Sequence, residues 1–383
     1  MQKWVLSGMA ALAMATSAEA ADLADVDRYI FVPNRNSADV AVIDTRENRV
    51  VARLAVGNVP HQVAVSDTLG KLVASNTADN TISVIDLAGD GEATTIALGL
   101  EPEHMELAPN GELLAVGNIG AGSVSLVSLG EEREIARVEG LYEPHNLTFS
   151  PDGSRLYVGN LGADFVSVID VASARVVEEI PVGEGQMVAH AGDGDPEYQG
   201  VINVTRTPDG RLGFAAFGEG NRLAVLDLRN GRKKRSLELG ELPWRAYSTA
   251  DGRYMIVPNN GDETVSIIST SSLEEVARLR GANGMTGVNT GWFETTAFVI
   301  SNAEDKLVVL DLETMQNAGE IALPGTPETG VTTPDGTRLY VSLSSTNQVA
   351  VIDTRERRLV DLIDNVGEEP WGAFMVGSLN YCH

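Results

Sequence analysis

Four histidines and one glutamate are side chains of this sequence whose types and positions suit a metal site. His61, His104 and His145 are separated by similar lengths of chain, Glu103 precedes the second of them, and His190 follows further on. Neutral imidazole is the commonest metal ligand in proteins, and imidazoles combined with a carboxylate suit zinc, copper or iron. Because the ligands of one ion must lie close together, the fold has to bring distant parts of the chain to one place.

The chain is built from an internal repeat, and these histidines follow its period. A segment of the type Val-x-Val-Ile-Asp occurs eight times, with a period of 42 residues that is broken once by an insertion of 15 residues. The eight segments end at Asp44, Asp86, Ser128, Asp170, Asp227, Ser269, Asp311 and Asp353. A fixed period of this length is typical of architectures in which each repeat is one structural unit.

Each repeat carries the signals of four short strands. In the unit that contains His145, alternating and β-branched segments lie at residues 146–150, 155–160, 165–170 and 176–182. A Pro-Asp-Gly turn follows the first strand in several units, since proline presets the first corner of a turn and glycine accepts a positive φ. We interpret the aspartate that ends the third strand as a turn former that accepts backbone amides.

Four strands per unit predict an all-β fold, a single β-propeller of eight four-stranded antiparallel blades. The chain begins with a second-strand signal at residues 29–34 and finishes with an isolated first strand at residues 371–376. Joined in one sheet, these two ends complete the eighth blade and close the ring. We expect the propeller to span residues 22–377, with a short tail at residues 378–383.

The repeat resembles a known family, the YVTN-type (YncE-like) propeller repeat. The segments that carry the resemblance are Tyr157 to Asn160 with Val166 to Asp170, Tyr340 to Ser342 with Val349 to Asp353, and Val56 to Pro60. The resemblance covers nearly all of the chain after its first residues and implies the propeller fold. It implies little about function, because the family spans surface-layer proteins, periplasmic proteins and relatives of redox-enzyme propellers. The chain departs from the pattern at Ser128, at Ser269 and at Trp292 to Thr295.

The loops that lead into the innermost strands of a propeller surround one mouth of its channel, which is the usual place for a ligand. A recurrent proline marks this point in most repeats. The residues after it are His61, Glu103, His145, Ile202, Trp244, Thr286, Glu328 and Trp371, and the next are Gln62, His104, Asn146, Asn203, Arg245, Gly287, Thr329 and Gly372. The ring thus collects three of the five histidines from three consecutive blades.

Two interpretations of this ring remain open. In the first, His61, His104 and His145 with Glu103 bind copper, iron or haem; in the second, they are polar residues that line a water-filled mouth. The offset of His104 by one position counts against the first interpretation. Trp244, Arg245 and Trp371 add aromatic and cationic surface that either stacks on a planar ligand or packs between blades.

Two further segments have side chains of interest. The insertion places His190 on the side of the ring histidines, where it either adds a ligand or lid or is an ordinary surface loop. The chain ends in Cys382 and His383, which either hold a soft metal such as copper, pair in an intermolecular disulfide, or form an ordinary tail. Because first strands run away from the histidine mouth, we expect this tail at the opposite face.

The first residues and the net charge indicate the cellular compartment and the classes of partner that the protein disfavours. Residues 1–21 have a lysine, an apolar run and a small-residue cleavage site, as in a secretory signal, which predicts a periplasmic protein. No run is apolar enough for a membrane span. With 28 basic and 54 acidic residues, the net charge of −26 disfavours nucleic acid as a partner.

We find no nucleophile elbow, phosphate loop, Cys-x-x-Cys-His haem attachment or metalloprotease motif. The sequence therefore favours a binding or scaffold protein over an enzyme, docking a periplasmic protein partner or a small ligand at the channel mouth. The alternative is a metallocofactor protein of periplasmic redox metabolism, since eight blades and ring histidines resemble the haem-carrying propeller of dissimilatory nitrite reductase. A lactonase-like hydrolase is a third, less well supported hypothesis, because Glu103 and Glu328 lie in distant blades.

Overall fold

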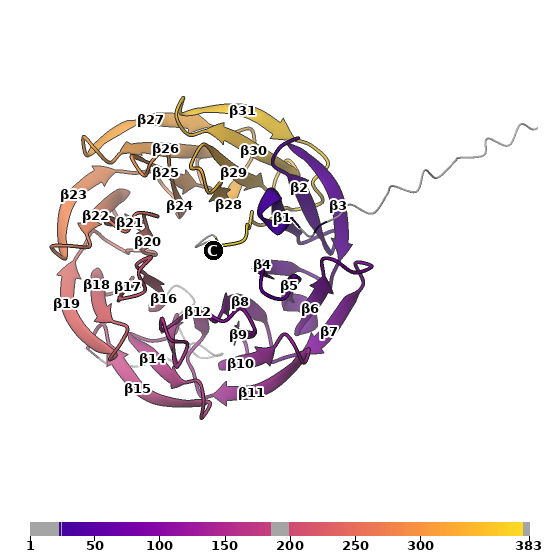
Figure 1. Ribbon diagram of the computed structural model, residues 1–383. Coiled ribbons are helices and arrows are strands. Elements are labelled where there is room, and N and C mark those ends of the chain that lie inside the picture. Colours follow the sequence, from indigo (N-terminus) through magenta and orange to yellow (C-terminus); the bar gives the residue numbers. More distant parts are fainter. Residues whose placement is uncertain (1–22, 24, 185–198, 378–383) are drawn as a thin grey trace, which may run out of the picture.

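The protein folds into eight β-sheets arranged around one axis, as a computed structural model shows (Figure 1). The structure describes residue 23, residues 25–184 and residues 199–377. The expected export segment at 1–21, His190 in the insertion, and the tail with Cys382 and His383 lie outside these residues. The prediction of an eight-bladed propeller of antiparallel blades is confirmed.

Seven blades have four strands that pair in chain order from the axis outwards. They are β4 (Pro60–Ser66), β5 (Lys71–Asn76), β6 (Thr81–Asp86) and β7 (Ala93–Ala97); β8 (Pro102–Leu107), β9 (Leu113–Asn118), β10 (Ser123–Ser128) and β11 (Arg133–Glu139); β12 (Pro144–Phe149), β13 (Arg155–Asn160), β14 (Phe165–Asp170) and β15 (Arg175–Pro181); β16 (Val201–Arg206), β17 (Leu212–Phe217), β18 (Arg222–Asp227) and β19 (Arg232–Glu238); β20 (Tyr247–Ser248), β21 (Tyr254–Asn259), β22 (Thr264–Ser269) and β23 (Glu274–Arg280); β24 (Met285–Gly291), β25 (Thr296–Ser301), β26 (Lys306–Asp311) and β27 (Gln316–Ala322); β28 (Pro327–Thr332), β29 (Arg338–Leu343), β30 (Gln348–Asp353) and β31 (Arg358–Ile363).

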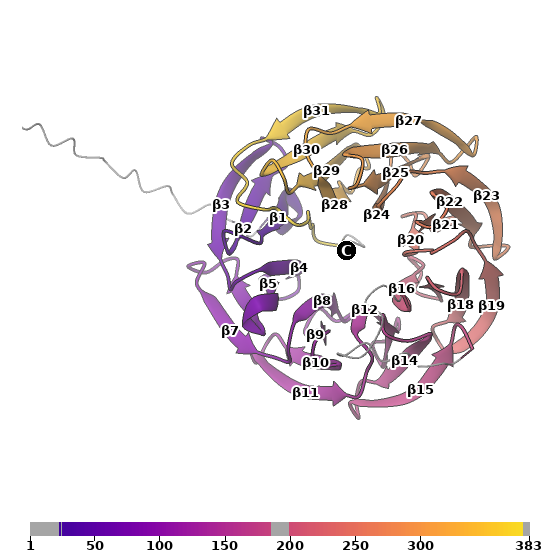
Figure 2. The same ribbon diagram turned by 180° about the vertical axis from the view of Figure 1, so that it is seen from behind.

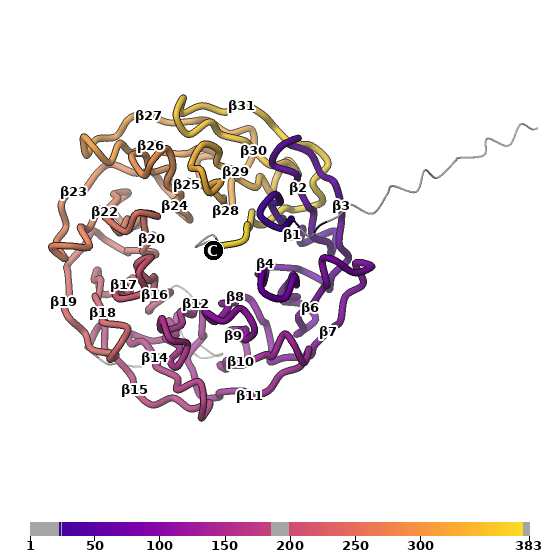
Figure 3. Tube along the Cα trace, in the orientation of Figure 1, coloured from indigo at the N-terminus to yellow at the C-terminus, as the bar shows by residue number. Residues whose placement is uncertain are grey.

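The remaining blade joins the two ends of the chain. It contains β1 (Tyr29–Asn34), β2 (Asp39–Asp44) and β3 (Arg49–Ala55), after a 3-10 turn η1 (Val26–Arg28). Its innermost position is filled by the last described residues, which reach β1 through isolated bridges at Phe31 with Phe374 and Asn34 with Pro370. In Figure 3 the yellow end of the trace lies beside indigo β1. The two ends of the described chain therefore close the ring as expected. The sequence predicts a regular strand at residues 371–376, whereas the structure has only isolated bridges there.

Burial explains why the middle strands carry the strongest repeat signal. Strand β14 is buried along almost its whole length, whereas β15 at the rim is mostly exposed. The two faces of a blade pack on its neighbours, so the second and third strands have no solvent face and need apolar residues at successive positions. The outermost strands, such as β19, are largely polar and form the outer wall of the ring seen from both sides (Figures 1 and 2).

The recurrent aspartate after the third strand has the expected role. Asp44, Asp170 and Asp311 each accept a backbone N–H two or three residues further on, at 2.8–2.9 Å. Where serine replaces the aspartate, as at Ser128, the hydroxyl oxygen accepts the equivalent amide at 3.2 Å. These side chains are therefore engaged in turns and are not candidates for catalysis.

One inner turn departs from the Pro-Asp-Gly type. Where the other blades use a glycine with positive φ, Trp292, Phe293 and Glu294 have φ values of 48°, 57° and 58°. The turn is fixed from both sides, because Trp292 donates its N–H to Gly336 O at 2.7 Å and the Glu294 carboxylate accepts Ala250 N–H at 2.6 Å. Contacts with both neighbouring blades thus hold a backbone conformation that these residues disfavour on their own.

Candidate functional site

The channel-mouth histidines lie in β-bulges at the start of the innermost strands β4, β8 and β12. In β8 the register runs from Pro102 paired with Asn118 directly to Met105 paired with Val116, so that two residues oppose one. The same shift occurs after Pro60 in β4 and after Pro144 in β12. A bulge re-aims side chains that a regular strand would send to opposite faces. Both residues after the proline of such a strand can therefore contribute to one site. The one-position offset of His104 in the repeat is thus compatible with a site shared with His61 and His145.

Two neighbouring blades bring two imidazoles and a carboxylate together. His61 Nδ1 lies 3.5 Å from Glu103 Oε2, and His104 Nε2 lies 3.9 Å from the same oxygen. One ligand atom from each of these side chains lies within 4.8 Å of the others. Both imidazoles are buried and Glu103 is partly buried. Two histidines and one carboxylate form a ligand set that divalent zinc and iron use with further coordination positions open.

His145 extends this cluster from the third blade. Its Nε2 lies 3.1 Å from His104 Nε2, and the two rings are 3.9 Å apart between centroids. On its other side, His145 Nδ1 lies 3.0 Å from Asn146 Oδ1 and 3.2 Å from an Nη atom of Arg245. The structure thus gathers His61, Glu103, His104 and His145 in one group, which we call the histidine cluster.

The electrostatics favour an ionised Glu103 carboxylate and a neutral His145 imidazole. Burial acts to raise the pKa of Glu103, but the hydrogen bond with His61 and the charges of His61, His145 and Arg35 outweigh it, so the pKa lies below its ordinary value. Burial, reinforced by the charge of Arg245, lowers the pKa of His145 to about 3. Metal binding requires these protonation states, because only a deprotonated ligand offers its lone pair.

Cross-blade hydrogen bonds hold the first two blades of the cluster in register. The Gln62 side chain donates to Met105 O at 3.1 Å and accepts Met105 N–H at 2.8 Å. The Ser75 hydroxyl donates to Glu103 O at 2.8 Å. These bonds fix the backbone on both sides of His104. Gln62 therefore positions the cluster, a role that its place in the ring did not reveal.

The other ring residues take up separate positions. Trp371 meets His61 edge-on, with 6.0 Å between the ring centroids, and the guanidinium of Arg35 lies 4.2 Å above the Trp371 ring. Trp244 is partly buried beside Arg245, which is fully buried. Glu328 accepts the Ser344 hydroxyl. Trp371 and Arg245 thus adjoin the histidine cluster, and Glu328 is occupied by a bond within its own blade.

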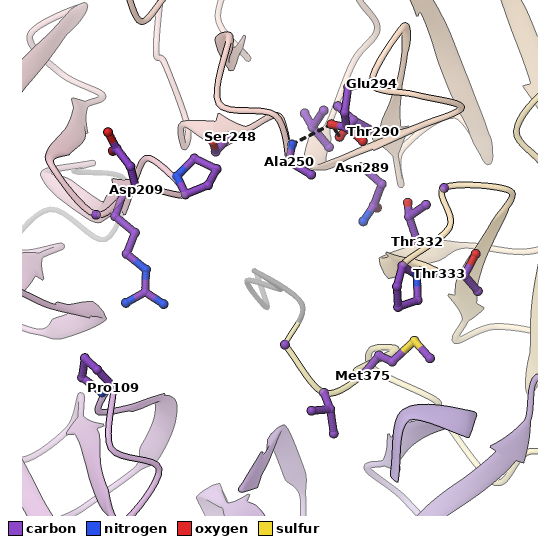
Figure 4. Close-up of a pocket in the computed structure, with 18 of the residues that line it drawn as sticks. Pro109, Asp209, Ser248, Ala250, Asn289, Thr290, Glu294, Thr332, Thr333 and Met375 are labelled. Atoms are coloured by element: carbon purple, nitrogen blue, oxygen red, sulfur yellow. Dashed lines mark hydrogen bonds between the residues drawn. The ribbon is translucent and has the colours of Figure 1, made fainter. Parts of the chain in front are cut away.

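A cavity of about 620 Å³ occupies the opposite mouth of the ring (Figure 4). It is lined by the turns between first and second strands, among them those at Pro109, Pro208 and Pro334. Val376 and Gly377 also line it, so the described chain reaches the face away from the histidine cluster, as the direction of the first strands predicts. The channel therefore has two chemically different ends, a histidine-rich one and one with mixed polarity.

The ion pair between Glu106 and Arg206 links these two ends. Arg206 lines the cavity, and its Nη1 lies 3.2 Å from a carboxylate oxygen of Glu106, two residues after His104. Burial raises the pKa of Glu106 to about 7 against the opposing charge of Arg206.

No helix among the described residues is long and apolar enough to cross a membrane.

Comparisons with known proteins agree on the fold. A family model described as "YNCE-like beta-propeller" matches residues 212–380, and one described as "Lactonase, 7-bladed beta-propeller" matches residues 54–195. A seven-bladed β-propeller protein of Mycobacterium tuberculosis is 32% identical over 119 residues, which are 30% of each chain. The chain thus matches less than a third of the length of this relative, and its own ring has eight blades.

Solved structures cover more of the chain at lower identity. A dihydro-heme d1 dehydrogenase in complex with DHE has a TM-score of 0.74 at 16% identity, over 92% of this chain and 76% of that one. The apo structure of AztD from Citrobacter koseri has a TM-score of 0.67 at 14% identity, over 92% of this chain and 99% of that one. At these identities the likeness concerns the fold. Together with the ring of blades, it shows that the chain is a β-propeller, and over residues 212–380 its sequence is similar to the YNCE-like β-propeller family.

Proposed function

We propose that this protein is a periplasmic binding protein that takes up a divalent transition-metal ion in its histidine cluster. The observation that carries the proposal is the approach of His61, Glu103 and His104 from two blades, with His145 of a third blade in contact. Zinc, copper and iron are the candidates, since imidazole suits all three. The secretory character of residues 1–21 supports the location.

The residues present fit such an ion. Zinc accepts nitrogen and oxygen ligands at about 2.0–2.2 Å in a tetrahedral arrangement. The separations of 3.5, 3.9 and 3.1 Å within the cluster are those of atoms that small side-chain movements bring onto one ion. The cluster would hold the ion.

The test is stoichiometric metal binding by the mature protein. Protein stripped with a chelator is titrated with Zn(II), Cu(II) and Co(II), and bound metal is measured by elemental analysis. We expect one ion per chain, and none after combined His61→Ala and His145→Ala substitution. Glu328→Gln is the matched control, because it removes a carboxylate of the same ring that lies outside the cluster. Full metal uptake by the double variant would refute the proposal.

Haem is the second candidate. The specific observation is the fold match to a dehydrogenase solved in complex with DHE, together with aromatic and cationic side chains beside the histidines. A histidine can serve as the axial ligand of haem iron. Protein from the periplasm is examined by visible spectroscopy, as isolated and after haem is added. A histidine-dependent haem band would favour this candidate, and a colourless protein that binds zinc would favour the first.

A further inference from the structure

One blade has a net charge opposite to that of the whole chain. Residues 201–238, which form the blade of β16 to β19, include eight basic and four acidic residues. The rest of the chain has 20 basic and 50 acidic residues. Counted from first to last strand residue, the other six four-stranded blades are each net negative. This blade is therefore the part of an acidic protein that can attract anions.

The cations gather at the outer strand of this blade. Four basic residues follow one another in β19, and all four are exposed: Arg232, Lys233, Lys234 and Arg235. Arg229, which is also exposed, lines with Lys234 a cleft of about 510 Å³ towards the next blade. We call these five residues the basic edge.

Nearby carboxylates neutralise only part of the basic edge. Lys234 and Arg235 each have a carboxylate oxygen close by, at 3.6 and 3.2 Å. Among the described residues, no carboxylate forms an ion pair with Arg229, Arg232 or Lys233. Three exposed cations are therefore available to an anionic partner.

Other outer strands balance their charges within the strand. β11 has two arginines and two glutamates, and Arg137 pairs with Glu134 at 2.8 Å. β23 has the same composition of charges, and Arg278 pairs with Glu275 at 2.9 Å. Charged side chains protect the edge of a sheet from aggregation. Mixed charges thus suffice for that purpose, and the excess of one sign at β19 needs another explanation.

The outer side of β19 can accept another strand. β19 is the last strand of its sheet, so no described strand pairs with that side, and alternate residues point their N–H and C=O groups outwards. Cations lie on both faces of the strand, since Lys233 donates to Pro181 O of the preceding blade at 2.8 Å and Arg235 pairs with Glu274 of the next. An added strand would therefore meet cations with side chains on either of its faces.

We propose that the basic edge docks an extended acidic segment of a partner protein, which pairs with β19 as a further strand. In this kind of recognition, main-chain hydrogen bonds supply affinity and side chains supply selection. Carboxylates beside Arg232 and Lys233 would select the segment. This interaction lies at the rim of the ring and does not depend on metal binding by the histidine cluster.

An anionic lipid surface fits the basic edge less well. Among the described residues, none of the exposed large hydrophobic side chains lies in this blade, so nothing there can insert into a bilayer. Both flanking blades are net negative, and a flat anionic surface would come close to them. A single extended segment contacts β19 without that repulsion.

The test measures binding of a fluorescent peptide in which glutamate and threonine alternate. Fluorescence anisotropy with the mature protein is recorded at about 0.01 M and about 1 M salt, between which the Debye length falls from about 30 to about 3 Å. We expect binding at low salt that is lost at high salt. Combined Arg232→Glu and Lys233→Glu substitution should weaken it at least about tenfold, because one unit-charge contact at about 4 Å in water is worth about fivefold.

A matched variant and a second peptide serve as controls. Arg133→Glu with Arg137→Glu in β11 changes the net charge equally at another outer strand and should leave the affinity unchanged. A peptide with the same number of glutamates and proline at every third position cannot form the ladder of main-chain hydrogen bonds in either register. It should lose most of the affinity.

Several results would overturn the proposal. Equal losses in the two double variants would mean that overall charge attracts the peptide, and equal binding of the two peptides would mean that no strand is added. The absence of peptide binding at low salt would also refute it, as would binding of phosphatidylglycerol vesicles or of a second copy of the chain in place of the peptide. Should the reversed variant not fold, as judged by circular dichroism, Arg232→Gln with Lys233→Gln replaces it, and Arg133→Gln with Arg137→Gln becomes the control.

Discussion

At the scale of single residues, the histidine cluster shows how burial shapes the chemistry of an imidazole. His145 is enclosed by His104, Asn146 and Arg245, and burial with the Arg245 charge holds its pKa near 3. The same site stabilises the ionised form of Glu103. The cluster therefore combines a negative charge at Glu103 with a neutral nitrogen ligand at His145. Such a set attracts a divalent cation more strongly than imidazoles alone, because the carboxylate contributes charge as well as a ligand atom.

Glu103→Gln tests the contribution of that charge. The amide has nearly the same shape but carries no charge and is a poorer ligand. We expect the affinity for Zn(II) to fall by at least about tenfold, the lower limit for loss of an outer partner of a metal ligand. Competition titration measures it, and Glu328→Gln should leave the affinity unchanged. Equal effects of the two substitutions would mean that overall charge, rather than the Glu103 carboxylate, attracts the ion.

At the scale of the elements, one residue type serves the same turn in nearly every blade. Asp311 accepts the amides of Glu313 and Thr314 at 3.1 and 2.8 Å, and Arg357 donates to its second oxygen at 3.0 Å. The hydrogen bond from the Thr314 amide lowers the pKa of Asp311 most, and the hydrogen bond from Arg357 lowers it further. Burial acts in the opposite direction but is outweighed, so the pKa of Asp311 falls to about 2. The ionised form is therefore favoured in the folded protein.

Asp311→Ala should lower the free energy of unfolding by about 1 kcal/mol at pH 7, the net value of a typical hydrogen bond. Since folding lowers the pKa from 3.8 to about 2, the contribution is complete above pH 3.8 and disappears as the pH falls through 2. Urea unfolding at several pH values should show the difference shrinking over this range. For Ser128→Ala, whose hydroxyl does not ionise, the difference should stay constant. A pH-independent loss in both variants would contradict this account of Asp311.

At the scale of the whole molecule, the ring depends on contacts between its two ends. Phe31 N–H donates to Phe374 O at 2.8 Å, Phe374 N–H donates to Phe31 O at 2.9 Å, and both rings are buried in one core cluster. The closure has two isolated bridges where a regular inner strand such as β12 has four register pairs with its neighbour, and it joins the two ends of the described chain. It is consequently the place where we expect the ring to open first.

Phe374→Ala tests this expectation. Replacing a buried phenylalanine by alanine typically lowers the free energy of unfolding by about 3–5 kcal/mol. Here the lost contacts are those that hold the two ends of the chain together. We expect faster hydrogen exchange at the amides of Phe31 and Trp371, whose bonds span the closure. Phe298→Ala, in the core of a complete blade, should cost similar stability and leave those two amides protected. Unchanged exchange at Phe31 in the first variant would show that the closure does not depend on this side chain.

The sequence determined the fold because each blade is encoded locally. Short runs rich in apolar and β-branched residues, bounded by turn residues, predict strands such as residues 155–160 and 165–170 at their observed bounds, and the repeat number gives eight blades. First and fourth strands differ by one or two residues, as at β12 and β15, because their ends depend on neighbouring blades. The ring position also identified His61, His104 and His145 as neighbours across blades.

The tertiary structure alone decided how those residues meet. The offset of His104 counts against a shared site in a regular strand, and only the bulge after each proline removes that objection. The contact between Arg245 and His145 joins residues 100 positions apart from blades that are not adjacent. No local pattern encodes it, because it depends on the radius of the closed ring and on which rotamers fill the channel mouth.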